Sequence, residues 1–375
     1  MRRLAAAAWR ITLTRHLVTA AAGLLVLVVV MESVDDFRAV QLTEMAYLGI
    51  AAGGLTLLTG LNGQISLGHG ALMAVGAYTT ALLVSDDPVV PLVVAIVLAT
   101  AATTAVGVLI GAAAARLRGP YLAGATLALA VALPGLALHF KGTLGGEQGL
   151  RLRVPETPGW VLETAFFITG HDLTRSKYVA YIAWLTLVVV YLLLANLARS
   201  RVGRRWRAVR DDEVAAELAG IHLGRARVSA FVVSAAAAGA AGSVMALAVR
   251  LTAPTGFTLT LSLGLLTAVV LGGLGSLTGA LVGAALLTFL PSVITDAGTS
   301  MGLDDIAAAE LAPLVYGVVL VLVILLAPRG LVGGIEAGWR RLRHHRHPVV
   351  PPGSITTSDA APSRAPVATS KGDSR

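Results

Sequence analysis

Residues 89–115 read VVPLVVAIVLATAATTAVGVLIGAAAA, a run of 27 residues without a charged side chain. A helix needs about 20 apolar residues to cross the hydrocarbon core of a membrane, so this stretch predicts a transmembrane helix. Because the apolar residues are continuous rather than alternating, helices are indicated and a β-barrel is not. The fold class is therefore predicted to be an all-α polytopic membrane protein. Further runs with at most one charge each cover residues 17–31, 39–61, 121–138, 179–197 and 311–327.

The composition agrees with this fold class. Of the 375 residues, 56% are hydrophobic and 13% are charged, about half the charge of a typical soluble domain. The chain has no cysteine, which excludes disulfides, thiolate nucleophiles and cysteine-ligated metal sites. Four arginines precede the first apolar run, but no small-residue cleavage site follows it, so an uncleaved first span is favoured over a signal peptide.

Basic and acidic residues alternate between successive loops. This alternation follows the positive-inside rule, which favours a topology signal over a nucleic-acid surface despite the net charge of +8. We therefore expect a bacterial inner-membrane protein with both termini in the cytoplasm. The basic loops hold Arg116 and Arg118, then Arg199, Arg201, Arg204, Arg205, Arg207 and Arg210, then Arg340, Arg341, Arg343 and Arg346; the acidic loops hold Glu32, Asp35, Asp36, Asp86, Asp87, Asp296, Asp304, Asp305 and Glu310.

This orientation requires an even number of spans between cytoplasmic loops and predicts about ten transmembrane helices. Glycines interrupt the eighth and ninth spans, so a re-entrant segment stays open there. The expected spans are residues 17–32, 40–59, 69–84, 89–115, 120–139, 179–198, 227–250, 258–274, 276–295 and 311–328. They divide the chain into a cytoplasmic segment (1–16), a transmembrane domain (17–334) with an external loop (140–178) and a cytoplasmic loop (199–227), and a basic, then disordered, cytoplasmic tail (335–375).

Polar residues and glycines separate the second and third predicted spans. Non-helical backbone at membrane depth is tolerated only where it is buried in protein or lines a water-filled cavity, and broken helices commonly form transport sites. A plain tight turn is the alternative. We assign a candidate translocation path to Asn62, Gly63, Gln64, Ser66, Gly68 and His69, together with the glycine-rich break at Gly272, Gly273 and Gly275.

The cytoplasmic loop 199–227 begins basic and then turns acidic. Asp211 or Asp212 can cap a helix whose apolar positions, Val214, Leu218 and Ile221, recur at helical spacing. Glycine at position 220 is a natural helix stop. The pattern predicts a short amphipathic helix with a small-residue surface suited to a groove on a partner; a helix lying on the membrane surface stays open. The candidate residues are Arg210, Asp211, Asp212, Glu213, Ala215, Ala216 and Gly220.

Residues 203–221, GRRWRAVRDDEVAAELAGI, resemble the cytoplasmic loop of LivM-type permeases of branched-chain amino acid ABC importers. Two positions depart from the general importer loop: Val214 stands where glutamate is usual, and no proline follows Gly220 at the expected distance. The resemblance covers about residues 39–334. Further motifs match the family in the same order: GQISLGHG (63–70), GAY (76–78), LRGPY (117–121), GGEQGL (145–150), LGGLGSLTG (271–279) and PRGL (328–331).

The resemblance implies a permease subunit with the ten-helix fold of the vitamin B12 and ribose importers. It also implies partners: a second related permease, two cytoplasmic ATPases that couple to the loop 199–227, and an extracytoplasmic substrate-binding protein. Transport would proceed by alternating access. The sequence itself contains no phosphate-binding loop, so we expect ATP hydrolysis on separate subunits and no catalytic, cofactor or metal site in this chain.

Two other classes fit the sequence less well. An ion-coupled secondary transporter needs ionisable groups at mid-membrane, and the candidates Glu44, His69 and His139 are predicted to be interfacial. A membrane-embedded hydrolase needs a cluster of His, Asp or Glu within the spans, and the sequence offers none.

Overall fold

The computed structural model describes residues 23, 28–84, 90–114, 120–170, 172–326 and 330–334. The chain divides into two units, residues 1–335 and 336–375. All described residues belong to the first unit; the predicted segment 1–16, most of the first predicted span and the whole predicted tail 335–375 lie outside the described residues. The fold below is that of the first unit.

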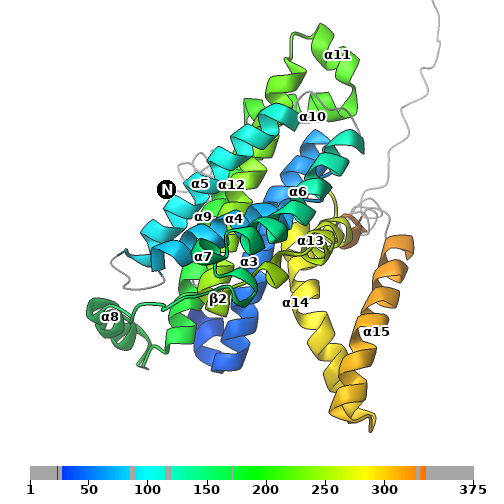
Figure 1. Cartoon of the computed structure of the whole chain (residues 1–375). Coiled ribbons are helices and arrows are strands. Elements are labelled where there is room, and N and C mark those ends of the chain that lie inside the picture. Colours follow the sequence, from blue (N-terminus) through cyan, green and yellow to red (C-terminus); the bar gives the residue numbers. More distant parts are fainter. Residues whose placement is uncertain are drawn as a thin grey trace, which may run out of the picture. The chain divides into compact units, whose positions relative to one another are not determined.

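The described chain is built almost wholly of helices (Figure 1). Long apolar runs form them because a helix satisfies every backbone hydrogen bond within its own segment. The long helices are α3 (Asp36–Thr56), which continues as the π-helix η1 (Leu57–Leu61), α4 (His69–Val84), α5 (Leu92–Ala114), α6 (Pro120–His139), α9 (Arg175–Arg199), α12 (Leu223–Val249), α13 (Leu259–Gly272), α14 (Leu277–Ser300) and α15 (Asp305–Leu326).

Seven of the described helices are long and apolar enough to cross a membrane, which confirms an all-α polytopic membrane protein. They are Asp36–Leu61, Leu92–Ala113, Tyr121–His139, Arg175–Arg199, Leu223–Val249, Pro254–Gly272 and Leu277–Ser300. Helix α4 is apolar but has only 16 residues. The predicted bounds of the spans lie within about five residues of the helix ends, apart from α15, which begins six residues before the predicted start. The predicted total of ten is not tested by this count.

Helix α12 occupies the centre and packs against α3, α4 and α5 (Figure 1). Small residues allow these helices to approach closely in lipid. A Cβ atom on Gly76 of α4 would overlap the backbone of Gly239 in α12. Helices α3 and α12 are accordingly the most buried spans, whereas less than a third of α5, α6, α9 and α14 is buried within the protein, as expected for helices that face lipid.

The predicted external loop 140–178 contains short elements. These are α7 (Lys141–Leu144), the 3-10 turn η2 (Gly146–Gln148), β1 (Leu150–Arg151) and α8 (Gly159–Thr169). Strand β1 pairs antiparallel with β2 (Leu251–Thr252), with Leu150 opposite Thr252. The 3-10 turn η3 (Pro254–Phe257) then leads into α13. The loop is thereby fixed to the end of α12.

Helix α9 joins this loop to the predicted cytoplasmic loop 199–227. With 25 residues it is about 37 Å long. Two short helices follow it, α10 (Arg201–Asp211) and α11 (Glu213–Leu218). The two loops therefore lie at opposite ends of the bundle, as Figure 1 shows for α8 and α11.

Candidate coupling and transport site

Helix α3 ends in a true break. Its last turn widens into η1, and the backbone amides of Gly63 and Gln64 donate to the carbonyls of Thr59 (3.1 Å) and Leu58 (3.1 Å). Gly63 has φ +77°, a left-handed conformation that favours glycine. Residues 63–68 are not helical, and α4 begins at His69. The predicted interruption is therefore present, and it is longer than a tight turn.

The extended segment runs back along α3. The His69 Nε2–H donates to the carbonyl of Ala51 at 3.1 Å, and Ala51 lies ten residues before the end of η1, about 15 Å along the helix. Neighbouring helices satisfy other groups of the segment: the Leu67 amide donates to Thr126 Oγ1 of α6 (3.0 Å), and the Gly70 amide donates to Ser262 Oγ of α13 (3.0 Å). Backbone amides at the end of the irregular segment are thus satisfied by neighbouring helices, as a membrane requires.

The polar side chains of this segment point inward. Asn62, Gln64, Ser66 and His69 are buried, whereas Gly63 is exposed. The Gln64 amide donates to Asn62 Oδ1. Within the described chain, three polar atoms of the segment lack a hydrogen-bond partner: Asn62 Nδ2, Ser66 Oγ and His69 Nδ1. Such atoms are costly when buried, so this segment is where a contact from outside the chain would be most stabilising.

The second glycine-rich break meets the first. Gly273 and Gly275 have positive φ values, +117° and +82°, between α13 and α14. A Cβ on Gly60 of η1 would overlap the backbone of Gly275. A Cβ on Gly272 would likewise overlap the carbonyl of Gly279 in α14. Of the predicted path glycines, Gly275 therefore forms a backbone contact with η1 through Gly60, which was not predicted, and Gly272 forms one with α14.

Helix α10 was not predicted from the sequence. Ser200 caps its start by accepting from the Val202 amide at 3.1 Å. The helix buries Gly203, Trp206 and Val209 and leaves several arginines exposed. The spacing of Val202, Trp206 and Val209 is a helical signal that the surrounding arginines obscured.

Helix α11 has the predicted caps. Asp212 Oδ1 accepts from the amides of Val214 (2.9 Å) and Ala215 (3.0 Å). At the other end, the Ile221 amide donates to the Ala216 carbonyl and the Gly220 amide to the Glu217 carbonyl, which is a Schellman motif with Gly220 at φ +79°. The predicted short helix and its glycine stop are confirmed.

The faces of α11 differ from the prediction. Ala216, predicted to line a partner groove, is 3% exposed and packs inside the chain. Val214 and Leu218 are instead 69% and 85% exposed, and Ala215 is exposed beside them. The correction has a physical reason: the salt bridge from Glu213 to Arg227 of α12 holds α11 so that Ala216 faces the bundle while Ala215 stays exposed.

Arg210 joins the loop to the helix break. Its Nη1 donates to the Gly60 carbonyl at 2.6 Å, and its Nε and Nη2 donate to Asp211 Oδ1 at 2.9 and 2.7 Å. A Cβ on Gly63 would lie 3.1 Å from Arg210 Cγ. Two regions singled out separately in the sequence, 62–69 and 210–220, therefore lie next to each other at Gly63 and Arg210, although the hydrogen bond itself is to Gly60, which was not singled out.

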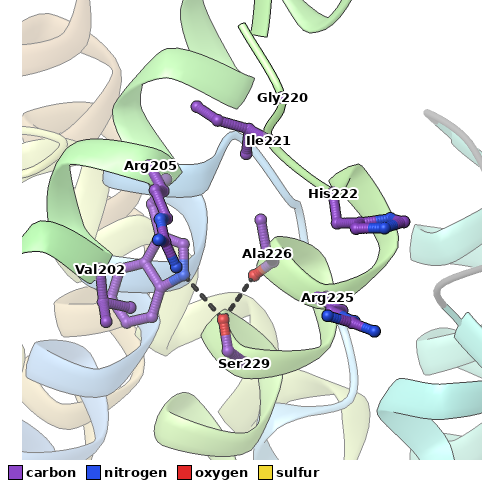
Figure 2. Close-up of a pocket in the computed structure, with 9 residues that line it drawn as sticks. Val202, Arg205, Gly220, Ile221, His222, Arg225, Ala226 and Ser229 are labelled. Atoms are coloured by element: carbon purple, nitrogen blue, oxygen red, sulfur yellow. Dashed lines mark hydrogen bonds between the residues drawn. The ribbon is translucent and has the colours of Figure 1, made fainter. Parts of the chain in front are cut away.

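A cavity of about 360 Å³ lies between α10 and the start of α12 (Figure 2). At its floor, Trp206 Nε1 donates to Ser229 Oγ at 3.0 Å, and Ser229 Oγ donates to the Ala226 carbonyl at 2.9 Å. Arg205 stands on one wall, and His222 and Arg225 on the other. Trp206, which sequence reasoning missed, thus fixes α10 to α12. Among the described residues there is no group of three or more His, Asp or Glu that could hold a metal ion.

Comparison with known proteins shows the family. The family model described as "Branched-chain amino acid transport system / permease component" matches residues 39–324. The chain belongs to this permease family. The match includes the helix break, the Arg210 contact, α11 and the α13–α14 turn, so every candidate site residue lies within the family's region.

Individual relatives carry the same description. The chain is 32% identical to the high-affinity branched-chain amino acid transport system permease protein LivM of Salmonella typhimurium, over 83% of this chain and 73% of the relative. It is 26% identical to the permease protein BraD of Pseudomonas aeruginosa (79% and 94%) and 27% identical to LivH of Escherichia coli (76% and 90%). These relatives are transport permeases, not enzymes. No solved structure gives a significant match.

Proposed function

We propose that this chain is the permease subunit of an ABC importer that moves branched-chain amino acids across the bacterial inner membrane. The LivM-type relatives and the buried, broken helix of the candidate path support this function. The complex contains a second, LivH-like permease, two cytoplasmic ATPases that hydrolyse ATP, and an extracytoplasmic substrate-binding protein. A LivH relative that also matches this chain supports a pair of related permeases.

In the proposed topology both termini are cytoplasmic and ten helices span the membrane. Seven of these spans are the long apolar helices named above. The other three are α4, α15 and residues 17–32. The short α4 fits this scheme, because the extended residues 63–68 supply the part of the span that α4 does not. A ten-span subunit resembling the permeases of the vitamin B12 and ribose importers follows.

The observation that carries the mechanism is the hydrogen bond from Arg210 to the Gly60 carbonyl. It connects the loop that meets the ATPases to the point where α3 breaks. Movement of α10 and α11 would therefore act on the candidate path directly. The Trp206–Ser229 hydrogen bond transmits the same movement to the central helix α12. Alternating access follows when ATP binding and hydrolysis in the ATPases move α10 and α11, and with them the break after α3 and helix α12.

Helix α11 is the coupling helix in this account, and Val214 and Leu218 are its contacts with an ATPase. Two exposed aliphatic side chains on one capped helix suit a shallow apolar groove. The buried Ala216 and the Glu213–Arg227 salt bridge hold α11 in place from the inner side. The groove on the ATPase thus binds a helix whose orientation is already fixed by the permease.

Reconstitution of the complex in proteoliposomes tests the function. ATP-dependent uptake of leucine should require the permease pair, the ATPases and the binding protein together. Leu218→Asp should leave the permease inserted but lower ATPase recruitment, since loss of a central interface contact typically costs about 2 kcal/mol or more. Met301→Asp is the matched control, because Met301 is equally exposed, at 85%, but lies after α14. No uptake of any branched-chain amino acid by the wild-type complex would overturn the proposal.

A further inference from the structure

A second cavity lies between α3, α12, α13 and α14 and has a volume of about 510 Å³. Glu44 and Tyr47 of α3, Met245 of α12, Thr267 of α13 and Leu287 of α14 contribute to its lining. The Tyr47 side chain lies beside the Glu44 carboxylate in this lining. Among the described residues, no lysine or arginine lines this cavity, and Glu44 is its one charged side chain.

Glu44 lies well inside a span. It follows Asp36, the first residue of α3, by eight positions, about 12 Å along the helix. The outer end of α3 is marked by Asp36 itself, which accepts a hydrogen bond from Thr174 at the start of α9 at 2.7 Å. In the other six of the seven long apolar helices, the one carboxylate is Asp296, near the end of α14. The interfacial position predicted for Glu44 from the sequence is therefore wrong, because α3 begins eight residues before it.

A carboxylate at this depth cannot face lipid tails without a large cost. A cavity on another side of the bundle makes the contrast clear: about 620 Å³ between α5, α9 and α12, it is lined by aliphatic side chains such as Val97, Val189 and Leu193. The hydroxyls of Thr100 and Thr186 there donate to carbonyls of their own helices. That aliphatic groove suits lipid, whereas the cavity at Glu44 needs water or protein.

We propose that the cavity at Glu44 is the part of the translocation path that receives the amino acid, with the Glu44 carboxylate accepting the substrate's ammonium group. The aliphatic walls, including Leu48 and Leu261, contact the apolar side chain of the substrate. The second permease closes the open side of the cavity and excludes lipid. This inference rests on the proposed function. It adds which part of the substrate the cavity recognises: a primary ammonium group beside an aliphatic chain.

The Glu44 carboxylate and the substrate's ammonium group are complementary in hydrogen bonding as well as in charge. An ammonium group has three N–H donors, and it can satisfy the two carboxylate oxygens of Glu44 and the Tyr47 hydroxyl oxygen. Charge-assisted hydrogen bonds of this kind are the stronger ones. Since no cationic side chain of the described residues lines the cavity, the site is open to a cation supplied by the substrate.

Leucine uptake by the reconstituted complex tests the role of Glu44. Glu44→Gln should reduce the leucine imported per ATP hydrolysed about tenfold, the effect of losing one charge-assisted hydrogen bond, while binding-protein-stimulated ATP hydrolysis is retained. Glu44→Asp should restore most of the uptake. Asp296→Asn, a carboxylate outside the cavity, is the control and should transport normally. Normal uptake by Glu44→Gln in a complex whose wild type transports leucine would overturn the inference and leave the proposed function intact.

Water access provides an independent test that does not depend on Glu44. In this cysteine-free chain, Thr267→Cys should react with a small charged thiol reagent and should be protected by leucine during turnover. Leu193→Cys, in the aliphatic groove, should react far more slowly because only hydrated thiols ionise readily. Equal reactivity of the two positions would contradict the proposed path, even if Glu44→Gln failed to assemble.

Discussion

At the scale of single residues, Arg210 makes the most informative contact. Its guanidinium donates a hydrogen bond to the carbonyl of Gly60, near the end of η1. Asp211 in turn accepts from the guanidinium and holds it in place. Sequence reasoning selected Arg210 and the neighbouring Gly63, each from its own motif, but not Gly60 itself. The contact could not be predicted, since it spans 150 positions of the chain and depends on how α3 and α10 pack.

Replacement of this arginine should uncouple transport from ATP hydrolysis. In Arg210→Ala the Gly60 carbonyl loses a charged donor, a loss of about 1.5–3 kcal/mol. We expect the ATPases still to bind and to hydrolyse ATP, with leucine uptake per ATP falling at least fivefold. Arg201→Ala is the control, because Arg201 is exposed on the same helix. Equal coupling ratios in both variants would show that the Arg210 contact does not transmit movement.

At the scale of elements, the long helices were predicted well because their apolar runs are uninterrupted. The bounds of α4 and α6 agree with the predicted residues 69–84 and 120–139. Helix α10 was missed because its buried face is narrow, consisting of Gly203, Trp206 and Val209 among arginines. The inner face of α11 could not be predicted either: its alanines look like a contact surface in the sequence, and only packing against α12 shows that Ala216 is buried.

The glycine stop of α11 gives a prediction at this scale. Gly220 has φ +79° and open space around its Cβ position, so a substitution there adds backbone strain without a clash. Gly220→Val should cost about 1–2 kcal/mol, loosen the end of α11 and reduce ATPase recruitment. Gly220→Asn should be tolerated because asparagine accepts the left-handed conformation. Co-purification of the ATPases with each variant measures this; identical recruitment by the valine and asparagine variants would rule out the role given to the cap.

At the scale of the whole molecule, the two ends of the bundle have different predicted environments. The α8 region and the α10–α11 region are separated by the length of α9, and arginines are concentrated at the second. The sequence predicts sidedness from charge, which the fold alone does not reveal, because a helical bundle has no intrinsic inside and outside.

Single cysteines test this sidedness. Glu156, with a 93% exposed side chain in the predicted external loop, and Glu217, exposed on α11, are suitable positions. In intact cells Glu156→Cys should react with a membrane-impermeant thiol reagent, and Glu217→Cys should react only after the cells are opened. The cysteine-free parent provides the background. The reverse pattern would invert the topology and remove α11 from the ATPases.

In the proposed complex, the exposed side chains of α11, Val214 and Leu218, contact an ATPase subunit. A photo-crosslinking amino acid at Leu218 tests it most directly, with the same amino acid at Met301 as the control, since both side chains are 85% exposed. In membranes containing the whole complex, the account predicts a crosslink from position 218 to the ATPase and none from position 301. Crosslinks from position 218 to lipid alone would show that α11 lies on the membrane surface, and would contradict the account.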